Sequence, residues 1–448
     1  MRVTALERQR RWFGRTLLIG SCLGIAWFFA PGLPILFGPW ASAATKQAGR
    51  ELFTHEWSAN DPLAHGDGLG PVFNARSCVA CHFQGGVGGG GGRAQNIHNF
   101  EVLPNRRDTQ SVSGTVHNFA VNAFDRESIE QVRQRYPIIK GGRQATQSEG
   151  CSYRTILLDV DPVRTQTVQP TALFGAGWID RISSRAITSH LMSQAAANII
   201  KELQLDWSAV PPGRVRVLPD GRIGKFGWKA QFATLEEFVA AACANELGLG
   251  TPSRPQVQPF SRPDAMAPAD LDKSQFKALV AFVDTLPCPV EEPPADAAGY
   301  AKSVRGKELF TSIGCAACHA RDLGGVKGVY SDFQLHILED PSVGGSSYGP
   351  EPPSDVPLPE DHPKDTEWRT PPLWGVADSA PYMHDGSAAT LRDAILRHGA
   401  DAKLVRDAFK KLKAGDQEAL IVFLGTLKAP PDARTVESAT QLAANHKP

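Results

Sequence analysis

The sequence predicts a mainly α-helical protein, with two domains in tandem and long irregular loops. Three observations lead to this expectation. The chain has 448 residues, which is too long for one small domain. One order of short motifs occurs twice, and apolar residues near the end of each copy follow helical spacing. The 42 glycines and 34 prolines predict the long loops.

Two diverged copies of one plan fill most of the chain. The first copy begins at residues 49–54 (GRELFT), which match 306–311 (GKELFT). The same order continues through four further pairs: 78–82 with 315–319, 173–175 with 373–375, 234–236 with 390–392, and 278–282 with 419–423. The number of residues that separates the two members of a matched pair falls from each pair to the next. The first copy is therefore the longer one and carries the larger insertions.

The expected elements follow this repeat. Apolar residues at helical spacing predict helices over 275–286 and 417–427. Two further helices are expected, over 235–247 with Thr234 as its N-cap and over 391–398 after Thr390. Glycine-rich and proline-rich composition predicts loops. These loops are residues 85–92 and 341–372. The expected domains are 45–288 (N-terminal, with insertions), 289–300 (a stiff polar linker), 301–430 (C-terminal) and 431–448 (a tail).

Composition excludes several classes of protein. Lys and Arg total 47 and Asp and Glu total 47, so the formal net charge is zero. A protein that mainly binds nucleic acid would need a basic surface. The hydrophobic fraction of 42% is too high for a disordered chain. Eight cysteines are too few for a disulfide scaffold of this length.

The N-terminal segment, 1–44, predicts export. Five arginines precede an apolar stretch from residue 16 to about residue 37, and small residues follow at 41–44 (ASAA). This order is typical of a cleaved signal peptide. The apolar stretch is also long enough for a single membrane anchor, although Pro31, Gly32 and Pro34 would interrupt its helix. On either reading, residues 45–448 leave the cytoplasm.

Two Cys-x-x-Cys-His motifs carry the chemistry, at residues 78–82 and 315–319. This motif attaches c-type haem: the thiols add to the porphyrin vinyl groups and the histidine binds iron. A redox disulfide or half of a zinc site would not explain the histidine in both copies. We therefore expect two covalent haems, bound through Cys78, Cys81 and His82 and through Cys315, Cys318 and His319.

Four cysteines lie outside these motifs. Cys22 falls in the N-terminal segment, and Cys151, Cys243 and Cys288 remain. Three thiols form at most one disulfide, and the sequence leaves open which pair would form it.

With these motifs, the sequence resembles the bacterial dihaem cytochrome c peroxidase superfamily, and within it the branch of dihaem oxidoreductases, also called thiol oxidoreductases. The matching stretches span most of residues 45–430. They are 67–78, 172–177, 226–231, 369–375 and 380–386. The resemblance implies two cytochrome-c-like haem domains that face each other. The N-terminal haem would be peroxidatic, and the C-terminal haem would store and pass electrons.

The resemblance also implies roles for two residues of the first copy. Relatives have a tryptophan between the haems, ahead of a Thr-Leu-Glu-Glu helix, and Trp228 has similar spacing here. Relatives have a distal glutamate after that helix, and Glu246 is its counterpart by position in 245–248 (NELG). The structural alternatives are a tryptophan that packs a core and a glutamate at an exposed helix end.

The second axial ligand of the C-terminal haem is Met in typical relatives, and here His398 occupies the corresponding place. Met383 is the rival ligand. Two imidazoles would give iron a lower potential than a His/Met pair, which departs from the usual electron-storage role. His98 and His117 are open candidates to cap the N-terminal haem in a resting state.

The resemblance implies reduction of hydrogen peroxide to water, with electrons from a small cytochrome or cupredoxin. Two alternatives stay open: a dihaem enzyme that oxidises a side chain of a partner protein, and an electron-transfer protein without enzymatic activity. Thiol oxidation has little support, because no cysteine pair stands apart from the haem motifs. We expect a periplasmic protein, soluble or tethered to the inner membrane, and leave a structural calcium open.

Overall fold

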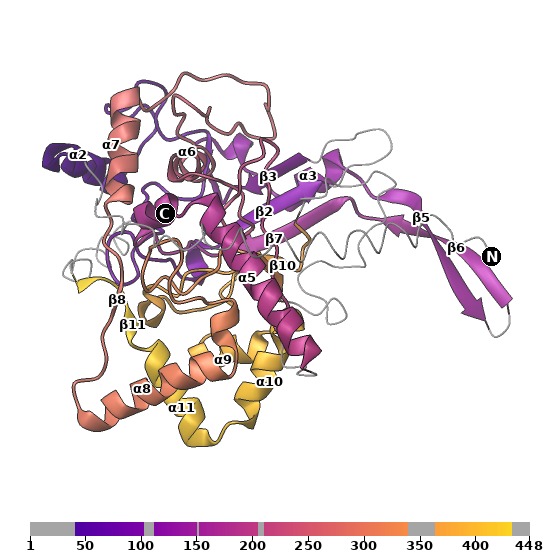
Figure 1. The fold of residues 1–448 in the computed structure, drawn as a ribbon. Coiled ribbons are helices and arrows are strands. Elements are labelled where there is room, and N and C mark those ends of the chain that lie inside the picture. Colours follow the sequence, from indigo (N-terminus) through magenta and orange to yellow (C-terminus); the bar gives the residue numbers. More distant parts are fainter. Residues whose placement is uncertain (1–40, 103–111, 150–151, 205–209, 339–362, 432–448) are drawn as a thin grey trace, which may run out of the picture. The chain divides into compact units, whose positions relative to one another are not determined.

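The computed structural model describes residues 41–102, 112–149, 152–204, 210–338 and 363–431 (Figure 1). These residues belong to one compact unit, which spans 39–448. Most of the predicted signal peptide or anchor, most of the loop predicted over 341–372, and nearly all of the tail lie outside the described residues. In the described part of the chain, no helix has the length and apolar character needed to cross a bilayer.

The helices fall into two groups along the chain, one for each copy. The helices of the first copy are α2 (Ala43–Thr54), α3 (Ile129–Arg135), α4 (Ala176–Arg181), α5 (Ser184–Leu203), α6 (Leu235–Glu246) and α7 (Lys273–Asp284). Those of the second copy are α8 (Ala297–Ser312), α9 (Leu391–Arg397), α10 (Lys403–Lys411) and α11 (Ala414–Leu424). The Thr234 hydroxyl caps α6, as predicted, and the Thr390 hydroxyl caps α9 in the same way.

The two copies use the same helix pair. Helices α2 and α7 pack together in the first copy, and α8 and α11 pack together in the second (Figure 1). A glycine lies at each crossing: a Cβ at Gly49 would come 2.0 Å from the Ala278 carbonyl oxygen, and one at Gly306 would come 2.0 Å from that of Ala419. The sequence motifs matched these four residues in pairs, so the repeat reflects a shared packing of two helices.

The prediction of a mainly α-helical fold is wrong. The described residues contain many strands as well, arranged in several small sheets. The strands are β1 (Val72–Phe73), β2 (Ile97–Val102), β3 (Val112–Val116), β4 (Phe119–Ala120), β5 (Ile139–Glu149), β6 (Ser152–Val160), β7 (Val163–Val168), β8 (Val290–Glu291), β9 (Leu335–Ile337), β10 (Glu367–Arg369) and β11 (Leu427–Lys428).

Most strand residues lie in the insertion of the first copy. Strands β3, β2 and β7 form an antiparallel sheet in that order, and β5 and β6 form a long hairpin (Figure 1). The sequence-based prediction assigned no strands to this insertion, although the burial of side chains alternates towards the end of β2. Phe100 and Val102 pack with Val132 and Val163 in a small core, and the residues between them face the other way.

The predicted linker also contains a strand. Residues 290–291 form β8, which pairs with β11. The end of the loop predicted over 341–372 contains β10, which pairs with β9 so that Trp368 lies opposite His336. By contrast, residues 85–92 contain neither helix nor regular strand, as expected. They are nevertheless largely buried, because this turn packs against the first haem motif.

Candidate functional site

The first haem motif lies in a turn beside a cavity of about 570 Å³. The backbone N–H of Val79 donates to the Phe53 carbonyl at 3.3 Å, which ties the motif to the end of α2. The N–H of His82 donates to the Cys78 carbonyl at 3.0 Å, so one helical turn brings Cys78, Cys81 and His82 to the wall of the same cavity. We call it the N-terminal cavity.

The His82 ring is oriented by the glycine-rich turn. Its Nδ1 lies 3.1 Å from the Gly89 carbonyl oxygen, which only accepts hydrogen bonds, so Nδ1 carries the proton. Burial lowers the pKa of His82 to about 4, although the Gly89 and Thr171 carbonyls oppose this effect. The ring is therefore neutral at physiological pH, and Nε2 has the lone pair that an iron ligand needs.

Glu246 also lines the N-terminal cavity, at the C-terminal end of α6. Asn74 Nδ2 donates to Glu246 Oε2 at 2.8 Å, and Asn118 N–H donates to Asn74 Oδ1 at 3.0 Å. The second contact fixes which end of the Asn74 amide faces the carboxylate. Burial raises the pKa of Glu246, and both the Asn74 hydrogen bond and the charge of His117 oppose that rise.

The sheet of β3, β2 and β7, which we call the insertion sheet, adds a polar wall to this cavity. Asn99 and Glu101 of β2 line it, opposite Thr115 of β3 and Arg164 of β7 in the strand register. Thr115 Oγ1 donates to Asn99 Oδ1 at 3.0 Å. The face of the sheet that looks away from the small core therefore supplies hydrogen-bonding groups to the N-terminal cavity.

Neither open candidate for a resting-state cap is placed to bind iron. His117 Nδ1 lies 2.7 Å from Glu127 Oε2 and its Nε2 lies 2.8 Å from the Asn245 carbonyl oxygen. Both nitrogens contact acceptor oxygens and the side chain is buried, so neither nitrogen is directed at the N-terminal cavity. His98 is exposed on β2, bonds Thr167, and is not among the residues that line the N-terminal cavity.

The second haem motif lines a separate cavity of about 260 Å³, which we call the C-terminal cavity. Cys315, Cys318 and His319 all face it. His319 Nδ1 lies 3.0 Å from the Tyr330 carbonyl oxygen, and burial lowers the pKa of His319 to about 4. The arrangement repeats that of His82. Phe310 lies 6.4 Å from the His319 ring centroid, as Phe53 does from that of His82.

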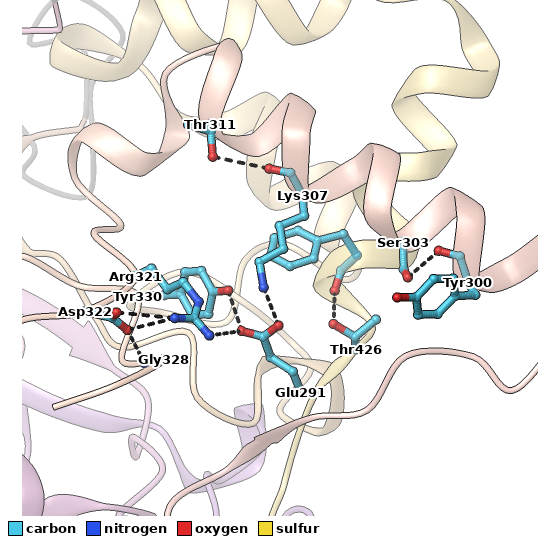
Figure 2. A network of polar contacts seen from close by, with 11 residues as sticks. Glu291, Tyr300, Ser303, Lys307, Thr311, Arg321, Asp322, Gly328, Tyr330 and Thr426 are labelled. Atoms are coloured by element: carbon cyan, nitrogen blue, oxygen red, sulfur yellow. Dashed lines mark hydrogen bonds and ion pairs between the residues drawn. The ribbon is translucent and has the colours of Figure 1, made fainter.

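Tyr330 is itself held by a polar network, shown in Figure 2. Its hydroxyl donates to Glu291 Oε1 at 2.7 Å, and Lys307 Nζ donates to Glu291 Oε2 at 2.5 Å. Arg321 approaches the same carboxylate at 3.4 Å. The predicted linker residue Glu291 thereby connects helix α8 to the segment whose carbonyl orients His319.

His398 and Met383 both line the C-terminal cavity. His398 Nδ1 lies 2.7 Å from the Ala394 carbonyl oxygen, one turn back in α9, so its Nε2 is also unprotonated. Burial is the main cause that lowers the pKa of His319, and the neighbouring His398 adds to it. The two rings are therefore close enough to interact, whereas the choice between His398 and Met383 as ligand stays a prediction.

Trp228 lines both cavities and so lies on their common wall. Its Nε1 donates to the Gln169 carbonyl oxygen at 2.8 Å. The backbone N–H of Gln169 donates in turn to the His384 carbonyl at 2.7 Å. This contact joins the tryptophan of the first copy to the turn at 380–386 of the second.

The donor sets fit two c-type haems. In each cavity the haem motif supplies two thiols and one neutral imidazole, whose Nδ1 contacts a backbone carbonyl oxygen and whose Nε2 could bind iron. Burial raises the pKa of Cys78 and of Cys315 to about 12, the opposite of the lowered pKa of a reactive redox thiol. Cys243 and Cys288 are free thiols in the described residues, and Cys151 lies outside them.

Sequence reasoning missed several residues of the two sites. Asn74 was part of a matching stretch but had no assigned role. Asp332 and His336 were missed entirely: His336 Nε2 lies 2.9 Å from Asp332 Oδ2, and its Nδ1 lies 3.7 Å from Cys318 Sγ. Both are buried, and no motif links them to Cys318 in the sequence. Only the turn between residues 319 and 336 brings them together.

Comparison with known proteins gives one family. The family described as "Di-haem oxidoreductase, putative peroxidase" matches residues 358–427. No curated protein sequence matches the chain.

Three solved structures are among those similar to this chain. Hydrazine synthase from Kuenenia stuttgartiensis is 18% identical over 58% of this chain and 73% of its own, with a TM-score of 0.31. A MauG-like protein associated with microbial copper homeostasis is 18% identical over 49% of this chain and 74% of its own, with a TM-score of 0.31. The diheme peroxidase BthA from Burkholderia thailandensis is 19% identical over 35% of this chain and 50% of its own, with a TM-score of 0.24.

TM-scores this low carry no argument about the family of this chain, so only the match to the family model bears on it. That match covers the turn at 380–386 and the segment with His398 and Met383, which the motifs had singled out. Over residues 358–427 the chain is similar to the di-haem oxidoreductase family, and this agrees with the resemblance that its motifs predict.

Proposed function

We propose that this chain is an exported dihaem c-type oxidoreductase that reduces hydrogen peroxide to water at its N-terminal cavity. Electrons from a small cytochrome or cupredoxin would enter at the C-terminal cavity. Cys78, Cys81 and His82 would hold one haem, and Cys315, Cys318 and His319 the other. Covalent attachment requires an extracytoplasmic compartment, which agrees with the export segment at 1–44 and with a periplasmic location.

One observation carries the proposal: the two cavities differ in the side chains that could bind iron as a second axial ligand, opposite the motif histidine. Among the described residues that line the N-terminal cavity, His82 is the only histidine and there is no methionine. The C-terminal cavity has His398 and Met383 in addition to His319. The first site therefore leaves a coordination position for substrate, and the second has side chains to fill it.

Bound haem would supply an iron centre that takes up peroxide and accepts electrons. Glu246 is the proton carrier in this proposal. Its carboxylate accepts the proton from one peroxide oxygen and returns it to the other, the leaving oxygen, so that water departs in place of hydroxide. Asn74 holds the carboxylate toward the cavity, and the raised pKa of Glu246 brings proton uptake nearer to neutral pH.

The position of His117 favours this proposal over a purely electron-transferring protein. That alternative requires a second ligand at the N-terminal haem, and His117 instead has both nitrogens bonded to Glu127 and Asn245. A protein-oxidising enzyme would use the same cavity, and it differs from the proposal in what finally supplies the electrons.

The test is peroxide consumption by the purified dihaem protein with a reduced small cytochrome or cupredoxin as donor. We expect Glu246→Gln to lower kcat/KM by about 10²–10⁴-fold, the usual contribution of a positioned general acid–base. Glu236→Gln is the matched control, because Glu236 is an exposed carboxylate in the first turn of the same helix. Wild-type activity in Glu246→Gln, or a wild-type protein that does not reduce peroxide, would contradict the proposal.

A further inference from the structure

A second tryptophan lies close to Trp228. The Trp368 ring stacks on His384, with centroids 3.5 Å apart and planes inclined by 14°. The same His384 ring meets Trp228 edge-on at 6.4 Å. Trp228, His384 and Trp368 all line the C-terminal cavity. An electron that leaves this region could therefore come from either indole, since both are held against the same imidazole.

Lys229 distinguishes the two indoles. Its Nζ lies 3.7 Å from the centroid of the Trp368 ring. The ammonium is fixed there, because it donates to the backbone carbonyls of Lys364, Asp365 and Glu367. A cation over the ring face attracts the neutral indole but repels an indole that has lost an electron. Lys229 therefore opposes oxidation of Trp368.

The indole N–H groups differ in the same direction. Trp368 is 2% exposed, and its Nε1 has no hydrogen-bond partner among the described residues. Oxidation makes the indole N–H far more acidic, and here its proton has no acceptor among the residues that the structure describes. Trp228 Nε1 donates to the Gln169 carbonyl at 2.8 Å, and that carbonyl dipole stabilises positive charge on the ring. Both contacts make Trp228 the easier indole to oxidise.

We propose that Lys229, held over Trp368 by three carbonyls, confines one-electron oxidation in this region to Trp228. The inference rests on the proposed function and adds a positioning residue to it. Conversion of hydrogen peroxide to two waters takes two electrons and two protons. The donor protein supplies both electrons by way of the C-terminal cavity, and one of them passes through the Trp228 indole, which loses an electron and is then reduced again. Trp368 stays reduced throughout, although its stacking on His384 would otherwise help to spread a charge.

The test oxidises the purified dihaem protein without peroxide. Photoexcited tris(bipyridine)ruthenium(II), quenched by a cobalt(III) ammine, gives ruthenium(III), which takes one electron from an indole and returns to ruthenium(II). Peptide mass spectrometry then measures stable oxygenated products at Trp228 and Trp368. We expect Lys229→Met to raise the ratio of Trp368 to Trp228 products at least about tenfold, because a charge in contact with the ring is removed.

Lys225→Met is the matched control. Lys225 is also buried and donates to backbone carbonyls, of Asp180 and Ile182, and it too lines the C-terminal cavity. It should leave the product ratio unchanged. An unchanged ratio in Lys229→Met, or wild-type protein oxidised equally at both indoles, would overturn the inference.

A second variant keeps the inference testable if Lys229→Met does not fold. With Lys229 in place, Trp228→Phe should not make Trp368 a major site of oxidation, and a shift of the products to Trp368 would contradict the inference. Peroxide consumption is measured on the same samples. A protein that does not consume peroxide contradicts the proposed function, whereas the product ratios with ruthenium still decide the role of Lys229.

Discussion

The two haem motifs lie in the same packing arrangement but open onto different cavities. In each half a helix pair meets at a glycine, a phenylalanine packs near the motif histidine, and a carbonyl fixes the Nδ1 of that histidine. The N-terminal cavity then gains Glu246 and a polar wall from the insertion sheet, whereas the C-terminal cavity gains His398 and Met383. The shared parts would hold haem, and the differing parts would decide what each haem does.

The largest effect we expect is the loss of one haem from one half. Replacement of Cys315 and Cys318 by alanine should leave a single covalent haem, because the thioether bonds of the C-terminal site cannot form. Replacement of Cys78 and Cys81 should do the same at the other site. Pyridine haemochrome assay and intact mass measure the number of haems. Two haems in either variant would show that the motifs do not attach them.

A smaller change should separate the two cavities by their ligands. His398→Gly should alter the absorption and electron-paramagnetic-resonance spectrum of the C-terminal haem alone, because it removes the imidazole expected to bind iron opposite His319. Met383→Leu is the matched variant in the same cavity and should leave that spectrum as it is. The reverse pattern would make Met383 the ligand, and an effect of neither would exclude both.

The shared packing predicts equal sensitivity of the two halves to one methyl group. We expect Gly49→Ala and Gly306→Ala each to cost about 1–3 kcal/mol of stability, because the new Cβ would overlap a backbone carbonyl oxygen. Gly415→Ala is the control: it lies in α11 with nothing within 4 Å of its Cβ, so a small gain from helix propensity is expected. Thermal unfolding measures all three. A neutral effect at only one of the two crossings would break the equivalence.

The smallest effect concerns the pH dependence of the N-terminal cavity. Burial raises the pKa of Glu246 and the Asn74 hydrogen bond opposes the rise, so Asn74→Leu should raise this pKa further. Glu246 acts first as a base, and activity is lost as pH falls through its pKa. The acidic limb of kcat/KM should therefore move upward by about one to two pH units, since a hydrogen bond to a charged group contributes about 1.5–3 kcal/mol and one unit is 1.36 kcal/mol.

The double variant Asn74→Leu, Glu246→Gln provides the control for this shift. It has no carboxylate to titrate and should show no acidic limb that depends on residue 74. A limb that stays in place in Asn74→Leu would mean that another group sets the pH dependence.

The sequence predicted the parts that depend on local chemistry or on the repeat. The two Cys-x-x-Cys-His motifs, the caps Thr234 and Thr390, and the glycine pair at the helix crossings could all be found from spacing. The insertion sheet was missed, because strands as short as Ile97–Val102 have only a weak alternating pattern in a sequence rich in glycine and proline. A repeat gives no information about an insertion that only one copy contains.

The contacts around the sites could not be predicted for a different reason. Asn74 and Glu246 lie 172 positions apart, and Lys229 and Trp368 lie on separate copies. Such pairs are defined by tertiary packing, and no local pattern encodes them. His117 shows the converse: its residue type suggested an iron ligand, but Glu127 and the Asn245 carbonyl occupy both of its nitrogens.

The central claim is that only the N-terminal cavity reacts with peroxide. The most direct measurement is an absorption and electron-paramagnetic-resonance titration of the half-reduced dihaem protein with hydrogen peroxide. We predict that one haem, the one retained in the variant that lacks Cys315 and Cys318, is high-spin or becomes so and reacts within seconds, while the other stays low-spin. Two low-spin haems that do not react with peroxide would contradict the account.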